Sequence, residues 1–257
     1  MKIKLFLLGV IMTTVAVAGS VNVKILQWNI HFGTDIDKKP ALAEQAAVIA
    51  RIDADVVALN EVDKLASRSN YVDMLKVIAE KANYPYSQFG AAFILPPDGL
   101  FGNAVLSRYK LEVAGAWAIP GTAWETRALL LMKVHAPKPF LLAVTHLNAH
   151  NSDEEKRLRV EAVKVIDEFL QTNNPENLPI VLVGDFNCGE KSDPVAILKT
   201  KNWHTAPFLP TWPANKAYAA LDHLYWRGNC QLVERRTVDE QKASDHLPVV
   251  NIVKINP

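Results

Sequence analysis

The sequence alternates short apolar runs with segments of helical periodicity, and this alternation limits the fold more than any other feature. The apolar runs have the length of β-strands and are rich in β-branched or aromatic side chains. Many of them lack a strict apolar–polar alternation, which is typical of strands covered on both faces. Strand-length runs that alternate with helices favour the α/β class. The predicted strands cover residues 23–30, 55–62, 103–107, 127–134, 140–147, 180–186, 221–226 and 247–255.

Three segments between these runs carry helix signals. Pro40 precedes the periodic stretch ALAEQAAVIARI, a second helix is predicted over residues 71–83, and the clearest helix covers residues 152–171. In this last segment Ser152 and Glu155 match a capping box, in which each side chain satisfies an orphan backbone amide at the helix start. These helices complete the alternating pattern of an α/β protein.

Residues 1–18 have the features of a secretory signal peptide. Two lysines precede an apolar run that starts at Leu5, and Ala16-Val17-Ala18 match a cleavage site of small residues. The apolar run is shorter than the roughly 20 residues that a membrane-spanning helix needs, so a retained anchor is the weaker alternative. We therefore expect cleavage after Ala18, a secreted or periplasmic protein, and no stable membrane span in the mature chain.

Composition narrows the class of protein further. The chain is 49% hydrophobic, which supplies a sizeable core and excludes disorder, and it has no internal repeat or long polar linker. We expect a single domain over residues 21–257 and a monomer. The 28 basic residues nearly balance the 27 acidic ones. Avid binding of duplex nucleic acid normally needs a Lys or Arg for each phosphate that is neutralised, so the overall charge does not indicate a nucleic-acid partner. A local basic patch would not show in the overall charge, and a nuclease therefore remains an alternative.

Polar residues of a consistent kind lie at the ends of the predicted strands. Open α/β sheets place ligands at the carboxyl ends of their strands. A single polar residue at a strand end is usually a turn former, whereas a series of Asn, Glu, His and Asp residues is hard to explain by turns alone. The residues that follow or precede strands in this way are Asn29, Glu61, His146, Asp185, Asn187, Asp245 and His246.

The side-chain types in this series favour a hard metal ion and a phosphate. Asp185 and Asn187 are separated by one residue, which on extended backbone aims both side chains to the same side. Carboxylate and amide oxygens suit Mg²⁺, Mn²⁺ or Ca²⁺ rather than zinc. A histidine beside a carboxylate can donate to a phosphate oxygen or assist proton transfer.

The motifs NIHFG, LNEVD, GNAVLSR, THL, GDFN, TWPA, LDHLY and SDHLPV occur in this order from about residue 25 to 250. In this order the series resembles the endonuclease/exonuclease/phosphatase superfamily. The resemblance implies an α/β fold that is a four-layer sandwich, with two mixed β-sheets packed face to face and helices on the outer faces. It also implies a divalent-metal-dependent hydrolase that acts on phosphate esters.

The resemblance assigns a metal-binding role to three residues. It implies that Glu61 is a direct ligand, that Asn29 lies at the metal, and that Asp245 is a ligand either directly or through water. The cofactor implied is Mg²⁺, with Mn²⁺ or Ca²⁺ as alternatives.

The resemblance assigns the chemistry at the phosphate to another five residues. Asp185 would orient or deprotonate the attacking water, and Asn187 would hold water or a phosphate oxygen. His146 and His246 would bind the phosphate and stabilise the pentavalent transition state, with Asp222 orienting His246. Phosphoryl transfer needs mainly positioned groups and charge neutralisation, so such a set works without a covalent nucleophile.

Three positions near these motifs carry open questions. Arg127 matches a phosphate-contacting arginine of relatives, and a surface salt bridge is the alternative. Asn60 stands where relatives usually have Gln, from which we expect a local change in geometry without loss of metal. The orienting partner of His146 is undecided between Asp98 and Asn103.

Other candidate residues are assigned structural roles. Four of the tryptophans are expected in core or rim packing, although they could stack a base or meet a lipid interface. The pairing of Cys188 with Cys230 stays open. The histidines left out of the site are His31, His135, His150, His204 and His223, and the four tryptophans are Trp28, Trp124, Trp212 and Trp226.

The resulting prediction is a secreted, metal-dependent phosphoesterase that cleaves a phosphodiester or phosphomonoester by in-line attack of water. The substrate could be DNA or RNA, a phospholipid head group as in a sphingomyelinase, or an inositol phosphate or other small phosphorylated metabolite. A catalytically inactive binding module on the same fold is the non-enzyme alternative. It is disfavoured because such a module should have lost part of a set that is complete here, Glu61, Asp185, Asp222, Asp245 and His246.

Overall fold

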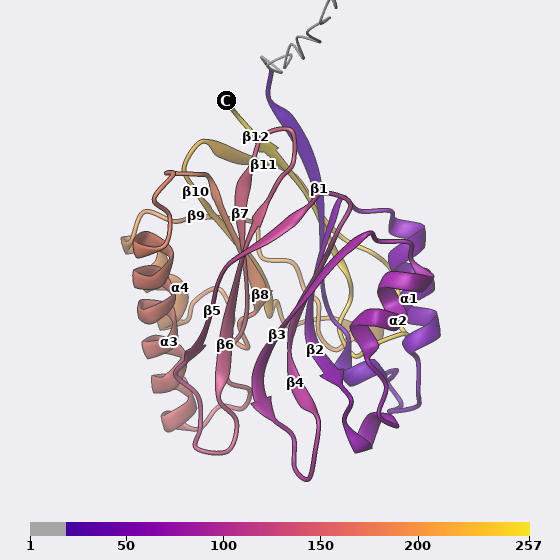
Figure 1. Ribbon diagram of the computed structural model, residues 1–257. Helices are drawn as coiled ribbons and strands as arrows, with labels where there is room; N and C mark the ends of the chain where they lie inside the picture. The colour runs from indigo at the N-terminus through magenta and orange to yellow at the C-terminus, as the bar shows by residue number, and fades with distance from the viewer. Residues whose placement is uncertain (1–18) are drawn as a thin grey trace, which may run out of the picture.

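Two six-stranded β-sheets pack face to face, and helices cover the outer face of each sheet (Figure 1). This architecture, given by a computed structural model that describes residues 19–257, confirms the four-layer α/β sandwich. The predicted leader, residues 1–18, lies outside the described residues. Within the described part of the chain, no helix is both long and apolar enough to cross a bilayer.

The first sheet joins the two ends of the described chain. Its strand order is β11-β12-β1-β2-β4-β3, in which β1 and β2 are parallel and the other neighbours are antiparallel. Helices α1 (Leu42–Ile52) and α2 (Met74–Lys81) cover its outer face. The strands are β1 (Val21–Asn29), β2 (Val56–Lys64), β3 (Tyr86–Ile94), β4 (Leu100–Ser107), β11 (Cys230–Thr237) and β12 (Val249–Ile255).

The second sheet has the same plan, with the order β5-β6-β7-β8-β10-β9 and one parallel pair, β7 with β8. Helices α3 (Asp153–Thr172) and α4 (Asp193–Thr200) cover its outer face. The strands are β5 (Leu111–Ile119), β6 (Arg127–Val134), β7 (Phe140–His146), β8 (Ile180–Asp185), β9 (His204–Thr205) and β10 (Asp222–Arg227). Short 3₁₀ turns cover His31–Gly33, Ser67–Ser69 and Ala214–Lys216.

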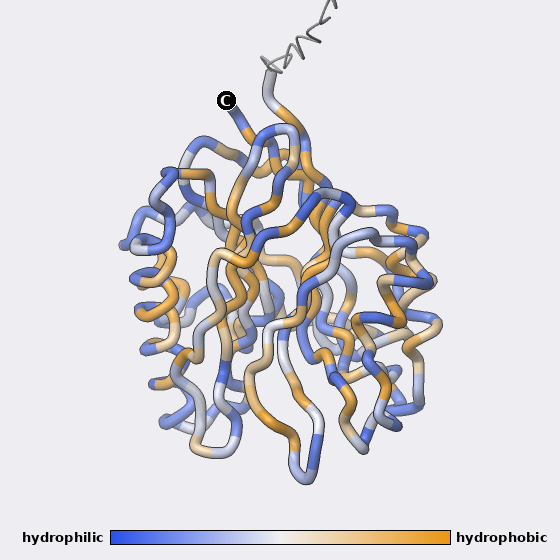
Figure 2. The backbone as a smooth tube through the Cα atoms, in the orientation of Figure 1, coloured by the Kyte–Doolittle hydropathy of each residue, from blue (hydrophilic) through white to orange (hydrophobic). Residues whose placement is uncertain are grey.

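Three apolar layers hold the four layers of backbone together. One lies between the sheets, where Val56, Leu142 and Val253 are buried. The second joins the first sheet to α1 and α2, and the third joins the second sheet to α3 and α4. Hydrophobic residues accordingly concentrate in the strands and on the inward sides of the helices (Figure 2). Both faces of the central strands are buried, which accounts for their apolar runs without strict alternation.

The sequence predicts the interior of the fold better than its edges. All eight predicted strands are present, and Ser152 and Glu155 form the expected capping box at the start of α3. The strands that were not predicted are β3, β5, β9 and β11, which are the four edge strands of the two sheets. Edge strands bury fewer of their side chains, so their sequences are more polar and give a weaker strand signal.

The two cysteines are separate buried thiols in different apolar layers. Burial raises the pKa of Cys188 to about 11 and that of Cys230 to about 12. Both therefore stay protonated at neutral pH and act as apolar core groups.

Gly184 allows the close approach of β8 to β7 one residue before Asp185. Its φ is 151°, and a Cβ atom at this position would lie only 1.8 Å from the backbone oxygen of Thr145. The same residue accepts a hydrogen bond at its own oxygen from Gln27 Nε2 at 2.7 Å. The backbone that carries Asp185 is thus fixed by a position where only glycine fits.

We expect Gly184→Ala to lower the free energy of unfolding by roughly 2–4 kcal/mol, because the added methyl group forces β7 and β8 apart. Urea unfolding followed by tryptophan fluorescence measures this change. Gly189→Ala is the matched control, since a Cβ atom there meets nothing within 4 Å, and it should change stability by less than about 0.5 kcal/mol. Equal stability of the two variants would contradict the packing argument.

Candidate functional site

The carboxyl ends of the two parallel strand pairs meet at one rim of the sandwich. In the first sheet Asn29 at the end of β1 is in register with Asn60 of β2. In the second sheet His146 at the end of β7 is in register with Asp185 of β8, and Asp185 is in register with Asp222 of β10. Because the sheets face one another, side chains from both converge at this rim. All nine residues predicted for the site lie here.

A β-bulge aims Glu61 into the site. The pairing of β2 with β4 gains one extra residue between Leu59 and Val62. Glu61 lies in this bulge with a left-handed φ of 56°, an unfavourable conformation for a residue other than glycine. Such strained positions cluster at functional sites. The side chain is turned by the bulge out of the normal strand alternation and toward Asn29.

The Asn29 amide joins the two central carboxylates. Its Nδ2 donates to Glu61 Oε1 at 3.0 Å and to Asp185 Oδ2 at 3.1 Å, while its Oδ1 accepts from the backbone amide of His31 at 3.0 Å. Burial raises the pKa of Glu61, and burial raises the pKa of Asp185 to about 7. A buried and a half-buried carboxylate this close together favour a cation between or beside them.

The donor atoms present fit a divalent cation. Glu61, His146 and Asp185 each bring one ligand atom within 4.8 Å of the others. Asp245 lies nearby, and its charge adds to the raised pKa of Glu61. Oxygen atoms dominate this set, which suits a hard cation. The closest cluster therefore includes two residues, His146 and Asp185, whose implied roles were at the phosphate.

His246 and Asp222 form a buried ion pair. The His246 Nδ1 atom lies 2.8 Å from Asp222 Oδ2. Although burial alone would lower it, the carboxylates of Asp222 and Asp185 raise the pKa of His246 to about 10. His246 is thus an imidazolium whose free Nε2 lies 3.6 Å from Asp185 Oδ2. The expected orientation of His246 by Asp222 is present in the geometry.

His146, in contrast, is held in its neutral form. Burial, with a contribution from Arg127, lowers its pKa well below the usual value, so the ring is neutral. Its Nε2 lies 3.0 Å from Asn187 Nδ2 and 3.7 Å from Asp185 Oδ2. The two histidines of the site therefore differ by one proton near neutral pH, a common sign of divided roles in acid–base chemistry.

Arg127, and neither of the two residues considered earlier, contacts the far side of His146. Its guanidinium nitrogen lies 3.4 Å from His146 Nδ1, and the arginine is 4% exposed. Asp98 instead accepts from the backbone of Ser67, and Asn103 bonds to Asn60. The surface salt bridge considered for Arg127 is present to Glu125, but the arginine itself is buried and its Nε has no partner.

Asn60 has a larger structural role than its sequence position suggested. Its Nδ2 donates to Asn103 Oδ1 at 2.7 Å and to the Thr145 carbonyl at 2.9 Å. Its Oδ1 accepts from the backbone amide of Asp185 at 3.0 Å. The side chain therefore connects the first sheet to β7 and β8 of the second sheet, directly beneath the site.

His31 belongs near the site, although the sequence analysis left it out. Its Nδ1 lies 3.8 Å from Asp245 Oδ1, and its backbone is left-handed with a φ of 46°. Thr34 Oγ1 lies 3.0 Å from the same ring nitrogen. The position two residues after Asn29 was the available signal, because the turn that follows β1 returns this ring toward the rim.

A cavity of about 490 Å³ opens above these residues. Its floor contains Glu61, Asp185 and His246, one wall is the loop of residues 149–151, and the other wall comes from the segment of residues 212–221. The wall residues were not predicted as part of the site. Most of them lie in loops, where no strand or helix pattern marks them, whereas Trp212 lies in the motif TWPA and Leu221 begins the strand predicted over residues 221–226.

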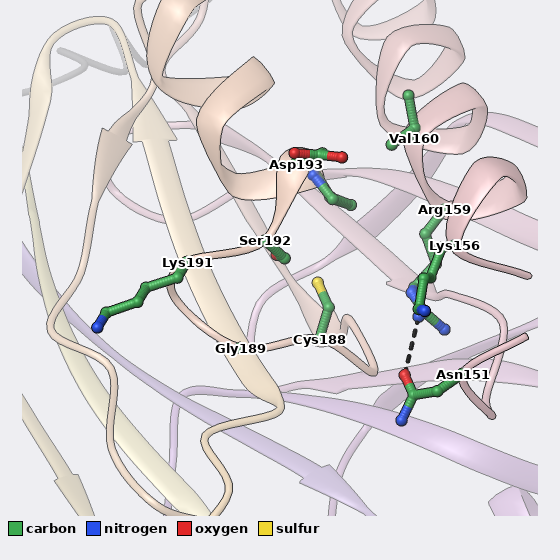
Figure 3. Close-up of a pocket in the computed structure, with 10 residues that line it drawn as sticks. Asn151, Lys156, Arg159, Val160, Cys188, Gly189, Lys191, Ser192 and Asp193 are labelled. Atoms are coloured by element: carbon green, nitrogen blue, oxygen red, sulfur yellow. Dashed lines mark hydrogen bonds between the residues drawn. The ribbon is translucent and has the colours of Figure 1, made fainter. Parts of the chain in front are cut away.

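Arg159 of α3 holds the first wall in place. This arginine is 3% exposed and donates to the carbonyls of Asn148 at 2.8 Å and His150 at 2.7 Å, and to Asn151 Oδ1 at 3.2 Å. Figure 3 shows the contact with Asn151 at the edge of a separate cavity of about 360 Å³ between α3 and the start of α4. Asn151 lines both cavities, so the loop is a partition that is anchored from behind.

Fold and site together define a phosphoesterase-like sandwich, and comparison with known proteins gives the family. Residues 26–246 match the model of the Endonuclease/Exonuclease/phosphatase family, and the chain belongs to this family. Members of the family are hydrolases that act on phosphate esters and use divalent metals. This confirms the resemblance seen in the sequence motifs.

Individual relatives are distant in sequence and similar in fold. Uncharacterized protein YbhP of Escherichia coli (strain K12) is 26% identical over 175 residues, which cover 64% of this chain and 66% of that protein. A crystal structure of an endonuclease/exonuclease/phosphatase from Beutenbergia cavernae has a TM-score of 0.78 at 21% identity and covers 91% of this chain and 72% of that chain. A mannosyl-6-phosphatase from Bacteroides thetaiotaomicron has a TM-score of 0.67 at 16% identity, with 90% and 99% covered.

We expect Glu61→Gln to weaken Mg²⁺ or Mn²⁺ binding by about tenfold or more without unfolding the domain, because an amide oxygen carries no charge for the cation. Isothermal titration calorimetry measures the affinity, and thermal unfolding checks the fold. Glu80→Gln on the exposed side of α2 is the control and should bind metal as the wild type does. An unchanged affinity of Glu61→Gln would refute the assignment of Glu61 as a ligand.

Proposed function

We propose that this protein is a secreted, divalent-metal-dependent phosphoesterase that hydrolyses a phosphate ester by in-line attack of water. The observation that carries the proposal is the convergence on one carboxylate oxygen, Asp185 Oδ2. The Nε2 atoms of His246 and His146 lie 3.6 and 3.7 Å from it. One cationic and one neutral imidazole beside a carboxylate place two phosphate-binding rings and a water-orienting group within one small site.

The proposed mechanism gives each side chain one task. Asp185 accepts a hydrogen bond from the attacking water and takes its proton as the water oxygen bonds to phosphorus. The phosphorus–oxygen ester bond on the opposite side breaks, and the alcohol departs after its oxygen takes a proton from solvent water. The His246 imidazolium donates from Nε2 to a phosphate oxygen and stabilises the charge of the pentavalent transition state, with Asp222 holding its orientation. His146 binds a second phosphate oxygen, and Asn187 holds water or a phosphate oxygen.

The metal would be held on the Glu61 side of the site. Glu61 would be the direct ligand, with Asn29 beside it and Asp245 as a ligand directly or through water. The bound cation supplies charge neutralisation to the phosphate and lowers the cost of placing an anion among carboxylates. Arg127 supports the same task from the His146 side, since its buried guanidinium adds positive charge where the phosphate would lie.

The proposal extends to cellular location. The leader directs export of the chain and is removed by cleavage after Ala18, and the mature protein acts as a monomer outside the cytoplasm. N-terminal sequencing of protein recovered from the periplasm or the medium should begin at Gly19, and a sequence that begins at Met1 would overturn this part of the proposal.

We expect His246→Ala to lose about 100-fold or more of the turnover, because the group that neutralises the transition state is removed. The assay uses bis-p-nitrophenyl phosphate, plasmid DNA, sphingomyelin and phosphorylated inositols, each with Mg²⁺, Mn²⁺, Ca²⁺ or a chelator. His135→Ala, on the hairpin between β6 and β7 at the opposite end of the sandwich, is the control and should retain activity. Turnover that survives the chelator, equal activity of His246→Ala, or no hydrolysis of any ester would each refute the mechanism.

A further inference from the structure

We propose that the cavity above the phosphate site is a subsite for the alcohol portion of the ester, and that it takes an uncharged ring that carries a single phosphate. This inference rests on the proposed function and names the chemistry of its substrate. The ring would pack against the aromatic wall formed by Trp212 and Tyr218, which both line the cavity. The phosphate would lie on the floor, at His246 and Asp185.

The aromatic wall is built directly onto the metal side of the site. Trp212 Nε1 donates to Asp245 Oδ2 at 3.3 Å, so the indole ring lies one hydrogen bond away from a carboxylate at the proposed metal. The backbone amide of Ala214 also donates to the Asp245 carbonyl at 2.7 Å. A group that projects from a phosphate bound at the floor is therefore within reach of this wall.

The wall is ordered by its own backbone. Trp212 and Ala219 exchange backbone hydrogen bonds of 3.1 and 2.9 Å, and the Tyr218 amide donates to the Trp212 carbonyl at 3.0 Å. These bonds fix the segment that carries both rings, while the buried Arg159 fixes the opposite wall. A cavity with two anchored walls is prepared for a rigid ligand and loses little entropy on binding.

Tyr218 offers a ring face that the protein itself does not cover. It is 71% exposed, and its ring stands edge-on to Trp212 with the centroids 5.9 Å apart. An exposed aromatic side chain at the mouth of a cavity provides a flat surface on which a ring can stack. A linear alcohol such as glycerol has no face to place against it.

The charges of the cavity exclude a second phosphate on the ligand. Among the described residues that line it, no Lys or Arg is present, and the ionisable groups are Glu61, Asp185, Asp245, His150 and His246. The proposed metal and His246 serve the phosphate at the floor. A second phosphate would face carboxylates and amides with no cation, which disfavours polyphosphorylated rings and polynucleotide chains.

Competition kinetics tests this subsite. The hydrolysis of bis-p-nitrophenyl phosphate is inhibited with glycerol 3-phosphate, a hexose 6-phosphate, a nucleoside 5′-monophosphate or inorganic phosphate, and each inhibition constant is measured. At least one ring-bearing ligand should bind about tenfold more tightly than glycerol 3-phosphate, the scale of stacking one ring. Preference for the hexose phosphate assigns a sugar, and preference for the nucleotide assigns a base.

Variants at Tyr218 test whether the preference for a ring-bearing ligand depends on this side chain. In Tyr218→Ala the ring-bearing ligand should lose its advantage over glycerol 3-phosphate, and Tyr218→Phe should keep it because the ring is retained. Tyr86→Ala is the matched control, since Tyr86 is an exposed tyrosine at the start of β3, at the other end of the sheet. The subsite proposal would be overturned if the wild type bound ring and linear phosphates equally, or if the preference for a ring survived Tyr218→Ala. Either result would leave the proposed phosphoesterase function standing. Absence of any turnover would instead overturn the proposed function, and the subsite with it.

Discussion

The site depends on polar connections between two sheets whose shared interface is mainly apolar. Asn60 donates to β4 and β7 and accepts from the backbone amide of Asp185. Gln27 makes a second connection, from β1 to the carbonyl of Gly184. Buried polar groups without partners cost about 1–3 kcal/mol each, so these bonds fix how the sheets align at the rim. The position of Asp185 follows from that alignment.

The Asn60 amide is long enough to make this connection by itself. The bonds of Asn60 reach Asn103 of β4, Thr145 of β7 and Asp185 of β8, and the last two lie at the carboxyl ends of their strands. The bulge turns Glu61 toward Asn29. Asn60 thus joins the two sheets, and the Glu61 carboxylate next to it lies within reach of the site.

The residues of the site could be predicted from the sequence because most of them lie at or next to the ends of buried strands. Asn29 and Asp185 end buried parallel strands, so an apolar run followed by a polar residue marks both of them. The edge strand β3 and the turn that carries His31 lack this signal, because their side chains are only partly buried and their backbone is set by neighbours. The bulge at Glu61 is likewise a property of pairing with β4, which a single strand does not encode.

The floor of the cavity and its walls likewise come from different parts of the fold. Floor residues are shared by the motifs that define the family, and their protonation states follow from burial and from two ion-pair partners. The cavity walls come from the loop of residues 149–151 and the segment of residues 212–221, which lie outside the strands. Near-neutral overall charge first suggested only that polyanions are disfavoured. The described lining of the cavity contains no Lys or Arg, so in the proposed subsite a single phosphate lies at the floor and the aromatic wall contacts the group attached to it.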